Sequence, residues 1–221
     1  MKLIKNGIIL TAETEFEGDI LVDGEVIRAV GRGLDGLADD VIDASGKYIF
    51  PGGVDEHTHF GSFGGRLFET TEAAAVGGTT TVVDFAPQDK GDSLGAAIEK
   101  HAARAAGVSC VDFGFHSMVM DMQADTADQL KELPEHGVSC VKMFMAYKGT
   151  PFYMEDASIL KVMNESRRHG ITMMVHAENP DMISFYTERL KAEGRLEPIS
   201  HAFSRPPVTE EEAVRHAIVM A

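Results

Sequence analysis

The pattern of apolar and polar positions changes character near residue 50. Up to that point the chain carries short alternating runs at 3–10, 20–30 and 43–50, which are typical of β-strands. Asn6-Gly7 and Asp23-Gly24 each interrupt such a run and predict hairpin turns. We therefore expect residues 1–50 to form a small β-sandwich-like segment, the N-terminal part of a small β domain.

From residue 51 onward, apolar runs of strand length alternate with amphipathic helical stretches. The first helical pattern begins at an N-cap serine, and the other three end at a glycine. Residues 213–221 are typical of a helix that leads to a sixth strand. The strand candidates are 53–60, 79–85, 110–119, 139–146 and 171–177, and the helix candidates between them are 93–106, 126–136, 156–169 and 180–193.

Strand-then-helix units that repeat at a spacing of about 30 residues predict a parallel sheet. We predict an α/β fold in which residues 51–221 form the first five to six β/α units of a partial (β/α)8 TIM barrel. An open doubly wound sheet has the same spacing of strands and helices and stays open as an alternative. The chain has no Gly-x-Gly-x-x-Gly turn after a strand, which argues against dinucleotide binding.

Composition narrows the range of partners. The 221 residues include 35 Asp and Glu against 20 Lys and Arg, a formal net charge of −15. Nucleic acid is not expected as a partner, because phosphate backbones need a basic face. No apolar run is long enough to span a bilayer and the N-terminus lacks an apolar signal core, so we expect a cytoplasmic protein without a membrane partner. Cys110 and Cys140 are expected to be buried free thiols.

Four side chains of the metal-binding type fall at or near the ends of the predicted strands. His57 and His59 end the first strand of the barrel region, Lys142 lies inside the fourth, and His176 ends the fifth. Alternate strand residues face the same side, and barrel active sites lie at the C-terminal ends of the strands. We expect these four side chains to share one rim of the barrel, where three imidazoles favour metal binding over core packing.

Lys142 is the most informative of the four, because a charged amine in an apolar strand is costly unless it is paired or chemically changed. Carboxylation by carbon dioxide would give a carbamate anion that can bridge two divalent cations. A lysine that extends to the barrel mouth, or is ion-paired there, explains the pattern equally well. Lys148 is a competing candidate, but it precedes Gly149 and is expected in a loop.

The other polar candidates have less specific interpretations. His116 ends a strand-like run and is expected to be structural or to support the site, and Asp84 could either support a histidine or cap a turn. His201 is expected in a loop. The histidines on helical patterns are expected to be exposed to solvent; they are His101, His136, His169 and His216.

Five motifs in order give the chain a resemblance to a known family. Residues 51–60 (PGGVDEHTHF) resemble the metal-binding opening of the amidohydrolase superfamily. The other four resemble the hydantoinase and dihydropyrimidinase branch, and together the motifs extend through essentially the whole chain. They are 77–85 (GGTTTVVDF), 141–149 (VKMFMAYKG), 175–179 (VHAEN) and 201–207 (HAFSRPP).

The resemblance implies that His57 and His59 bind the more buried of two divalent metal ions. Lys142, N-carboxylated, would bridge both ions, His176 would bind the second, and Tyr147 would lie near the substrate oxyanion. Zinc is the expected metal and manganese also suits the site. His201 matches no ligand position.

The reaction implied is metal-assisted hydrolysis of a small cyclic amide, a hydantoin or a dihydropyrimidine, to an N-carbamoyl amino acid. The resemblance also implies a homo-oligomer, either a homotetramer or a homodimer. An allantoinase-like cyclic ureide hydrolase stays open as an alternative. A non-catalytic dihydropyrimidinase-related assembly protein is a further alternative, which the presence of all four ligand residues disfavours.

Two departures from the family limit what the resemblance implies. The stretch 61–66 is short and glycine-rich, which leaves substrate size and enantiomer preference open, and Gly61 replaces the arginine that dihydroorotases carry there. The family's fourth histidine and its aspartate lie on later strands that these 221 residues do not include. We therefore expect the 221-residue piece alone to bind metal poorly and to be inactive or weakly active.

Overall fold

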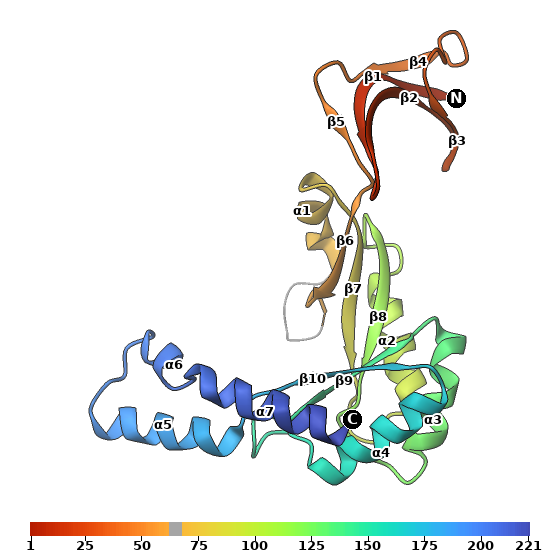
Figure 1. Cartoon of the computed structure of the whole chain (residues 1–221). Coiled ribbons are helices and arrows are strands. Elements are labelled where there is room, and N and C mark those ends of the chain that lie inside the picture. The colour runs from red at the N-terminus through yellow and green to blue at the C-terminus, as the bar shows by residue number, and fades with distance from the viewer. Residues whose placement is uncertain (62–67) are drawn as a thin grey trace. The chain divides into compact units, whose positions relative to one another are not determined.

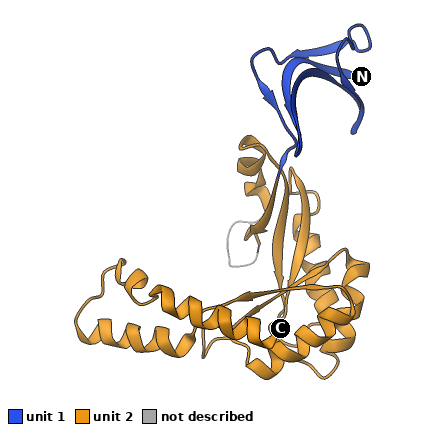
Figure 2. Ribbon diagram, viewed as in Figure 1, with its two compact units in different colours: residues 1–53 blue, residues 54–221 orange. Residues whose placement is uncertain are grey.

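The computed structural model describes residues 1–61 and 68–221 and divides the chain into two compact units (Figure 2). The first unit is Met1–Gly53 and the second is Val54–Ala221. The glycine-rich stretch 61–66, on which the open question of substrate size depends, lies outside the described residues from position 62 onward.

The first unit is a mixed five-stranded sheet in the order β3-β2-β1-β4, with β5 also paired to β1. The β1–β2 and β2–β3 pairs are antiparallel, while β4 and β5 run parallel to β1. Its buried apolar side chains include Leu3, Ile9 and Leu21. The strands are β1 (Lys2–Leu10), β2 (Glu15–Asp23), β3 (Val26–Gly31), β4 (Asp40–Asp43) and β5 (Tyr48–Ile49).

The two hairpin signals have different outcomes. Asp23 pairs with Val26 across a two-residue turn in which Gly24 has φ +60°, so the second hairpin is confirmed. The first prediction is wrong, because β1 continues through Asn6 as one strand with a register shift between Ile4 and Gly7. One extra residue on β1 forms a bulge, in which an Asn at φ +63° is as suitable as in a turn.

The run 43–50, predicted as one strand, is divided between two strands. Asp43 ends β4, and the chain turns before β5 begins at Tyr48. The turn is closed by the Lys47 amide, which donates to the Ala44 carbonyl oxygen at 2.9 Å.

The second unit is built on five strands in sequential order, β10-β9-β8-β7-β6 (Figure 1). The β7–β8, β8–β9 and β9–β10 pairs are parallel. The prediction of an α/β fold with part of a parallel barrel is therefore confirmed as a half-barrel. The strands are β6 (Gly53–Thr58), β7 (Thr79–Pro87), β8 (Asp112–Met118), β9 (Cys140–Phe144) and β10 (Thr172–His176).

The helices of the second unit follow the predicted pattern with three additions. The 3₁₀-helix η1 and the short helices α1 and α6 have no predicted counterpart, and α7 begins at Pro207 rather than at 213. The helices are η1 (Phe68–Thr70), α1 (Thr71–Val76), α2 (Leu94–Ala105), α3 (Thr126–Glu132), η2 (Leu133–His136), α4 (Asp156–Arg168), α5 (Pro180–Ala192), α6 (Ser200–Phe203) and α7 (Pro207–Met220).

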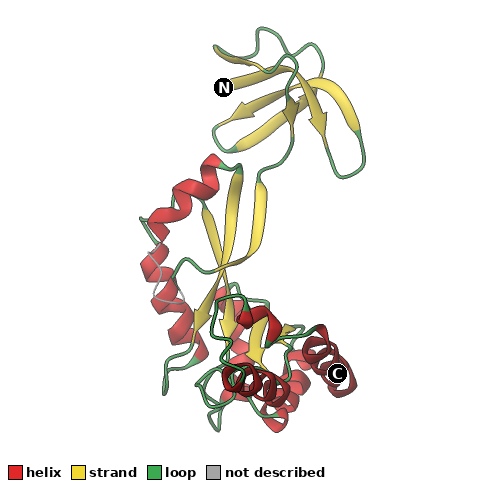
Figure 3. Ribbon diagram, turned by 90° about the vertical axis from the view of Figure 1, so that its left-hand side faces the viewer, coloured by secondary structure: helices red, strands yellow, loops and turns green. Residues whose placement is uncertain are grey.

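The two faces of this sheet have different neighbours, as the alternation along β9 shows. Val141 and Met143 are fully buried in a core that includes apolar side chains of α2, α3 and α4. Figure 3 shows helices running along one side of the strands. Phe144, two residues after Lys142, packs instead with Phe85 and Met118 in a separate cluster on the opposite face. That inner face is where a barrel places its active site.

Three further predictions can be compared with the structure. Both cysteines are free thiols, but only Cys140 is buried and Cys110 is exposed. His101, expected to be exposed, is 2% exposed on the inward side of α2. Within the described residues, no helix is long and apolar enough to cross a membrane.

Candidate active site

One cavity of about 450 Å³ on the inner face is lined by all five residues that the sequence singles out. His57 and His59 flank the last residue of β6, and His176 ends β10. Lys142 is the central residue of β9, and Tyr147 lies in the segment after β9. The cavity lining is His57, His59, Phe85, Lys142, Phe144, Tyr147, Thr150, Phe152 and His176.

His57 and His59 point together, as the alternation of strand residues predicts. Their ring centroids are 5.3 Å apart in an edge-on arrangement, and Phe85 lies 4.6 Å from the first ring and 5.0 Å from the second. Thr58, between them, is buried, and its hydroxyl donates to the Val83 carbonyl oxygen at 3.0 Å. This bond fixes the end of β6 against β7 and holds both imidazoles on the cavity side.

Lys142 is the buried cation of the cavity. The residue is 7% exposed, and its Nζ lies 5.9 Å from the centroid of Phe85 and 5.3 Å from that of Phe144. Among residues 1–61 and 68–221, no carboxylate forms an ion pair with it. Burial lowers the pKa of the Lys142 amine below its usual value, because an apolar site disfavours the charged form.

The electrostatics of the cavity favour neutral imidazoles at His57 and His59. Partial desolvation of the two rings, which stay exposed in part to solvent, is the largest cause of a lowered pKa at both residues, and the Lys142 charge contributes in the same direction. The His57 charge also lowers the pKa of His59. A neutral imidazole is the form that donates a lone pair to a metal, so the site favours the ligand form of both rings.

His176 approaches the cavity from the opposite side of Lys142. It pairs in register with Phe144 and stacks on that ring at 5.6 Å, and the Tyr147 ring lies 5.1 Å away. Its Nε2 is 2.7 Å from Oε2 of Glu178. Lys142 thus lies between two aromatic rings, of which Phe85 contacts His57 and His59, and Phe144 contacts His176.

Tyr147 has a strained backbone. Its φ of +64° lies in the left-handed region, which bulky residues rarely adopt. The Thr150 amide and hydroxyl hold this conformation by donating to the Tyr147 carbonyl oxygen at 3.0 and 2.8 Å. Strain of this kind is concentrated at functional sites, where it aims a side chain.

The remaining candidates support the site or lie outside it. Lys148 forms an ion pair with Asp181 at 2.8 Å and lines no part of the cavity. His116 packs on Phe85 at 5.0 Å, and its Nε2 is 2.9 Å from the Glu56 carbonyl oxygen. Asp84 is fully buried, and its Oδ2 accepts from the Gly61 amide at 2.9 Å. His116 and Asp84 thus anchor the backbone on either side of the two histidines.

The donor set would fit a metal site on the condition that Lys142 is carboxylated. Within the described part of the chain, no three side chains among His, Cys, Asp and Glu converge on a common point. Lys142 lies outside those residue types and becomes a donor only when it is carboxylated. A carbamate there would supply oxygen ligands between His57 and His59 on one side and His176 on the other. It would also remove the cost of a buried amine without a counter-ion.

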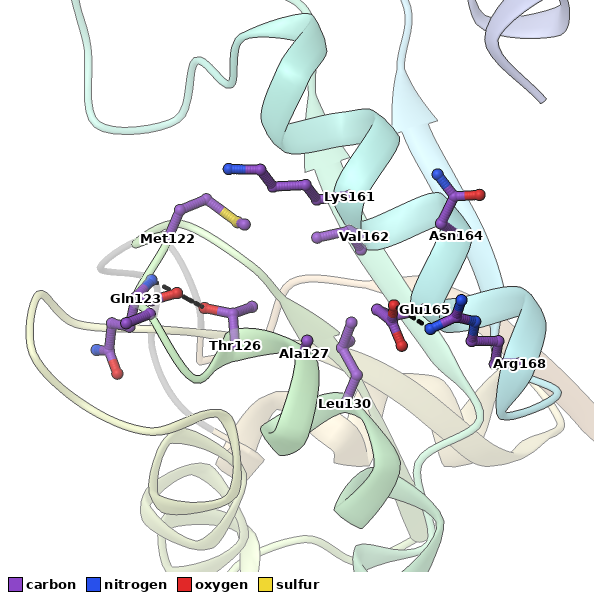
Figure 4. A pocket seen from close by; sticks show the side chains of 11 residues that line it. Met122, Gln123, Thr126, Ala127, Leu130, Lys161, Val162, Asn164, Glu165 and Arg168 are labelled. Carbon is purple, nitrogen blue, oxygen red and sulfur yellow. Dashed lines mark hydrogen bonds and ion pairs between the residues drawn. The ribbon is translucent and has the colours of Figure 1, made fainter.

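A larger hollow, of about 750 Å³, lies between α3 and α4 on the outer side of the half-barrel (Figure 4). Some of its polar groups are paired with one another. Arg168 donates to Glu165 at 2.9 Å, and the Gln123 amide donates to the Thr126 hydroxyl at 2.8 Å. Because its described lining contains neither histidine nor cysteine, we do not assign it the chemistry.

Two polar neighbours of the site, Glu178 and Arg205, have no role assigned from the sequence. His201, expected in a loop, lies in α6, and its Nδ1 is 3.2 Å from Nη1 of Arg205. Arg205 in turn lies 3.5 Å from Oε1 of Glu178. Both Glu178 and Arg205 belong to the motifs 175–179 and 201–207, but no spacing rule indicates that these two side chains meet.

Comparisons with known proteins give a consistent set of relatives. No protein-family model matches the chain. The D-hydantoinase of Geobacillus stearothermophilus is 43% identical over 223 residues, which cover 98% of this chain and 47% of that protein. A solved D-hydantoinase structure superposes with a TM-score of 0.93 at 41% identity, covering 99% of this chain and 49% of the other.

The dihydropyrimidinase of Brevibacillus agri superposes almost as well, with a TM-score of 0.92 at 39% identity, over 99% of this chain and 49% of that structure. The chain therefore spans about half the length of the curated and solved relatives that it matches.

Proposed function

Because this chain belongs to the hydantoinase/dihydropyrimidinase family and matches the N-terminal half of its members, we propose that its cavity is part of a binuclear metal site for opening cyclic amide rings. One observation carries the proposal. Lys142 is buried without a counter-ion among the described residues, and it shares a single cavity with three histidines from two other strands.

In this proposal His57, His59 and His176 would hold two divalent ions together with Lys142, which would supply oxygen ligands once it is carboxylated. Zinc suits a set rich in imidazole, and manganese also suits a carbamate. When bound, the two ions would activate a water molecule and polarise the substrate carbonyl group. The carbamate forms when the neutral Lys142 amine bonds to the carbon of carbon dioxide and releases one proton.

The residues of the chain itself bind and orient the substrate. Phe85, Phe144 and Phe152 give the cavity apolar walls that exclude water and accept an apolar ring substituent. The Tyr147 hydroxyl would donate a hydrogen bond to the oxygen on which negative charge develops as the amide carbonyl is attacked. The product would be an N-carbamoyl amino acid. The aromatic walls favour hydantoins and dihydropyrimidines over allantoin, whose substituent is polar.

The experiment is an assay of the chain in zinc and bicarbonate against a 5-substituted hydantoin, dihydrouracil and allantoin, with zinc retention measured by equilibrium dialysis. Lys142→Met removes the amine, while Lys148→Met removes an exposed lysine of the same region and serves as the matched control. We expect weak ring opening and zinc retention in the wild type and in Lys148→Met, and neither in Lys142→Met.

Two results would count against this assignment. Turnover that survives in Lys142→Met would exclude the carbamate-linked site. Zinc retained equally by the wild type and by Lys142→Met would likewise show that the Lys142 amine takes no part in metal binding. We also propose a homodimer or homotetramer, which sedimentation equilibrium of the chain would detect as a mass of two or four times 23.9 kDa.

A further inference from the structure

A second, polar cavity of about 480 Å³ adjoins the candidate active site and shares Lys142, Tyr147 and His176 with it. Its other walls come from the motifs 175–179 and 201–207, which contribute Glu178, His201 and Arg205. The proposed function assigns no role to these three polar side chains.

A chain of contacts joins these residues to His176. Oε2 of Glu178 lies 2.7 Å from Nε2 of His176, and Oε1 of the same carboxylate lies 3.5 Å from Nε of Arg205. Arg205 is fixed in turn, because its Nη1 donates to the Ser204 hydroxyl at 3.1 Å and to Nδ1 of His201 at 3.2 Å. Each carboxylate oxygen of Glu178 therefore faces a different partner.

The backbone keeps the two halves of this arrangement together. Glu178 lies between the end of β10 and the start of α5, while Arg205 lies between α6 and α7. The Asn179 amide donates to the Thr209 carbonyl oxygen at 2.9 Å, and the Asn179 side chain donates to Glu212 of α7. The segment that carries Glu178 is thus attached to α7 at the residue immediately after the glutamate.

The hydrogen bond between His176 and Glu178 determines which ring nitrogen of His176 keeps a lone pair for a metal ion. A neutral imidazole carries one proton, and an ionised carboxylate only accepts hydrogen bonds. A proton on Nε2 that is donated to Glu178 leaves the lone pair on Nδ1. Carboxylates that bind the distal nitrogen of a metal-ligating histidine fix its tautomer and its ring orientation.

We propose that Glu178, held by Arg205, is a positioning residue that fixes His176 with its proton on Nε2 and so makes Nδ1 the metal-binding nitrogen. The inference deepens the proposed function and rests on it for the role of His176. It gives the 201–207 motif a purpose, which is to hold the carboxylate that orients the third histidine.

The test is nuclear magnetic resonance of the ¹⁵N-histidine-labelled chain without metal at about pH 8, where an ordinary imidazole with a pKa of about 6.5 is neutral. We expect a slowly exchanging Nε2–H signal from His176, assigned by its loss in His176→Gln. The signal should disappear in Glu178→Ala and exchange faster in Arg205→Met. Glu210→Gln is the matched control, because Glu210 lines the same cavity and, within the described residues, forms no hydrogen bond or ion pair with His176.

Addition of zinc separates this inference from the proposed function. If zinc binds, its addition should shift the Nδ1 resonance of His176, and Glu178→Ala should weaken zinc binding about 10- to 100-fold while Glu210→Gln leaves it unchanged. An Nε2–H signal unaffected by Glu178→Ala, or zinc bound through Nε2, would overturn the positioning role. A wild-type chain with the Nε2–H signal whose zinc affinity is unchanged in Lys142→Met would overturn the proposed function and leave the tautomer assignment standing.

Discussion

At the scale of single residues, the cavity shows which contacts between side chains can be predicted from a sequence. His57, His59, Lys142 and His176 could be predicted to meet, because strand alternation and the ends of parallel strands determine where such side chains lie. Glu178 and Arg205 could not, because their contact depends on how the segment after β10 packs against the start of α7. Their roles as ligands and positioning groups stay predictions.

His101 shows the opposite error, since a histidine on an amphipathic helix was expected to be exposed and is buried. Burial lowers its pKa from 6.5 to about 4, with a smaller contribution from Arg104, while Asp89 acts in the opposite direction. Its Nε2 has no hydrogen-bond partner within residues 1–61 and 68–221. The folded state therefore holds this imidazole neutral over a pH range in which the unfolded chain takes up a proton.

This difference predicts a loss of stability in acid. The contribution of His101 should be constant above pH 6.5 and should decrease as the pH falls towards 4, because only the unfolded state gains the proton in that window. The full change amounts to about 3 kcal/mol. Urea unfolding at pH 7.5 and 4.5 gives the free energy of unfolding of His101→Leu and of the wild type. The stability of His101→Leu relative to the wild type should be greater at pH 4.5. A relative stability that is the same at both pH values would contradict it.

At the scale of elements, periodicity predicted the five strands of the half-barrel and four of its longer helices with small errors at the ends. It failed at Asn6-Gly7, because an Asn with positive φ is as compatible with a bulge as with a turn. The sequence alone does not show whether the partner strand requires a bulge or a turn at this position. Here β2 continues opposite β1 past the extra residue, and the Asn6 amide donates to Asp19 at 3.0 Å.

The bulge predicts how substitutions at Asn6 should behave. Asn6→Ala places a Cβ-bearing residue without a local polar group at φ +63° and should cost about 1–2 kcal/mol of unfolding free energy. Asn6→Gly loses the same hydrogen bond to Asp43 but tolerates that φ, so it should be the more stable of the two variants. Urea denaturation of both variants measures the difference, and equal stabilities would show that the left-handed backbone carries no strain.

At the scale of the whole molecule, the central fact is that the chain matches about half the length of D-hydantoinases and dihydropyrimidinases. The fold class was predictable because repeated strand-helix units and five ordered motifs agree. Residue type alone does not mark Lys142 as a donor, and its proposed role comes from the resemblance of the motif 141–149. The proposed metal site requires a carboxyl group that is added to Lys142 after synthesis of the chain.

The most direct test is a crystal structure of the chain grown with zinc and bicarbonate, with anomalous scattering recorded at the zinc absorption edge. We predict an anomalous peak inside the cavity lined by His57, His59 and His176, together with continuous density for a carboxyl group on Nζ of Lys142. An unmodified lysine with zinc bound only outside this cavity, or with no zinc bound, would contradict the assignment of a carbamate-linked metal site.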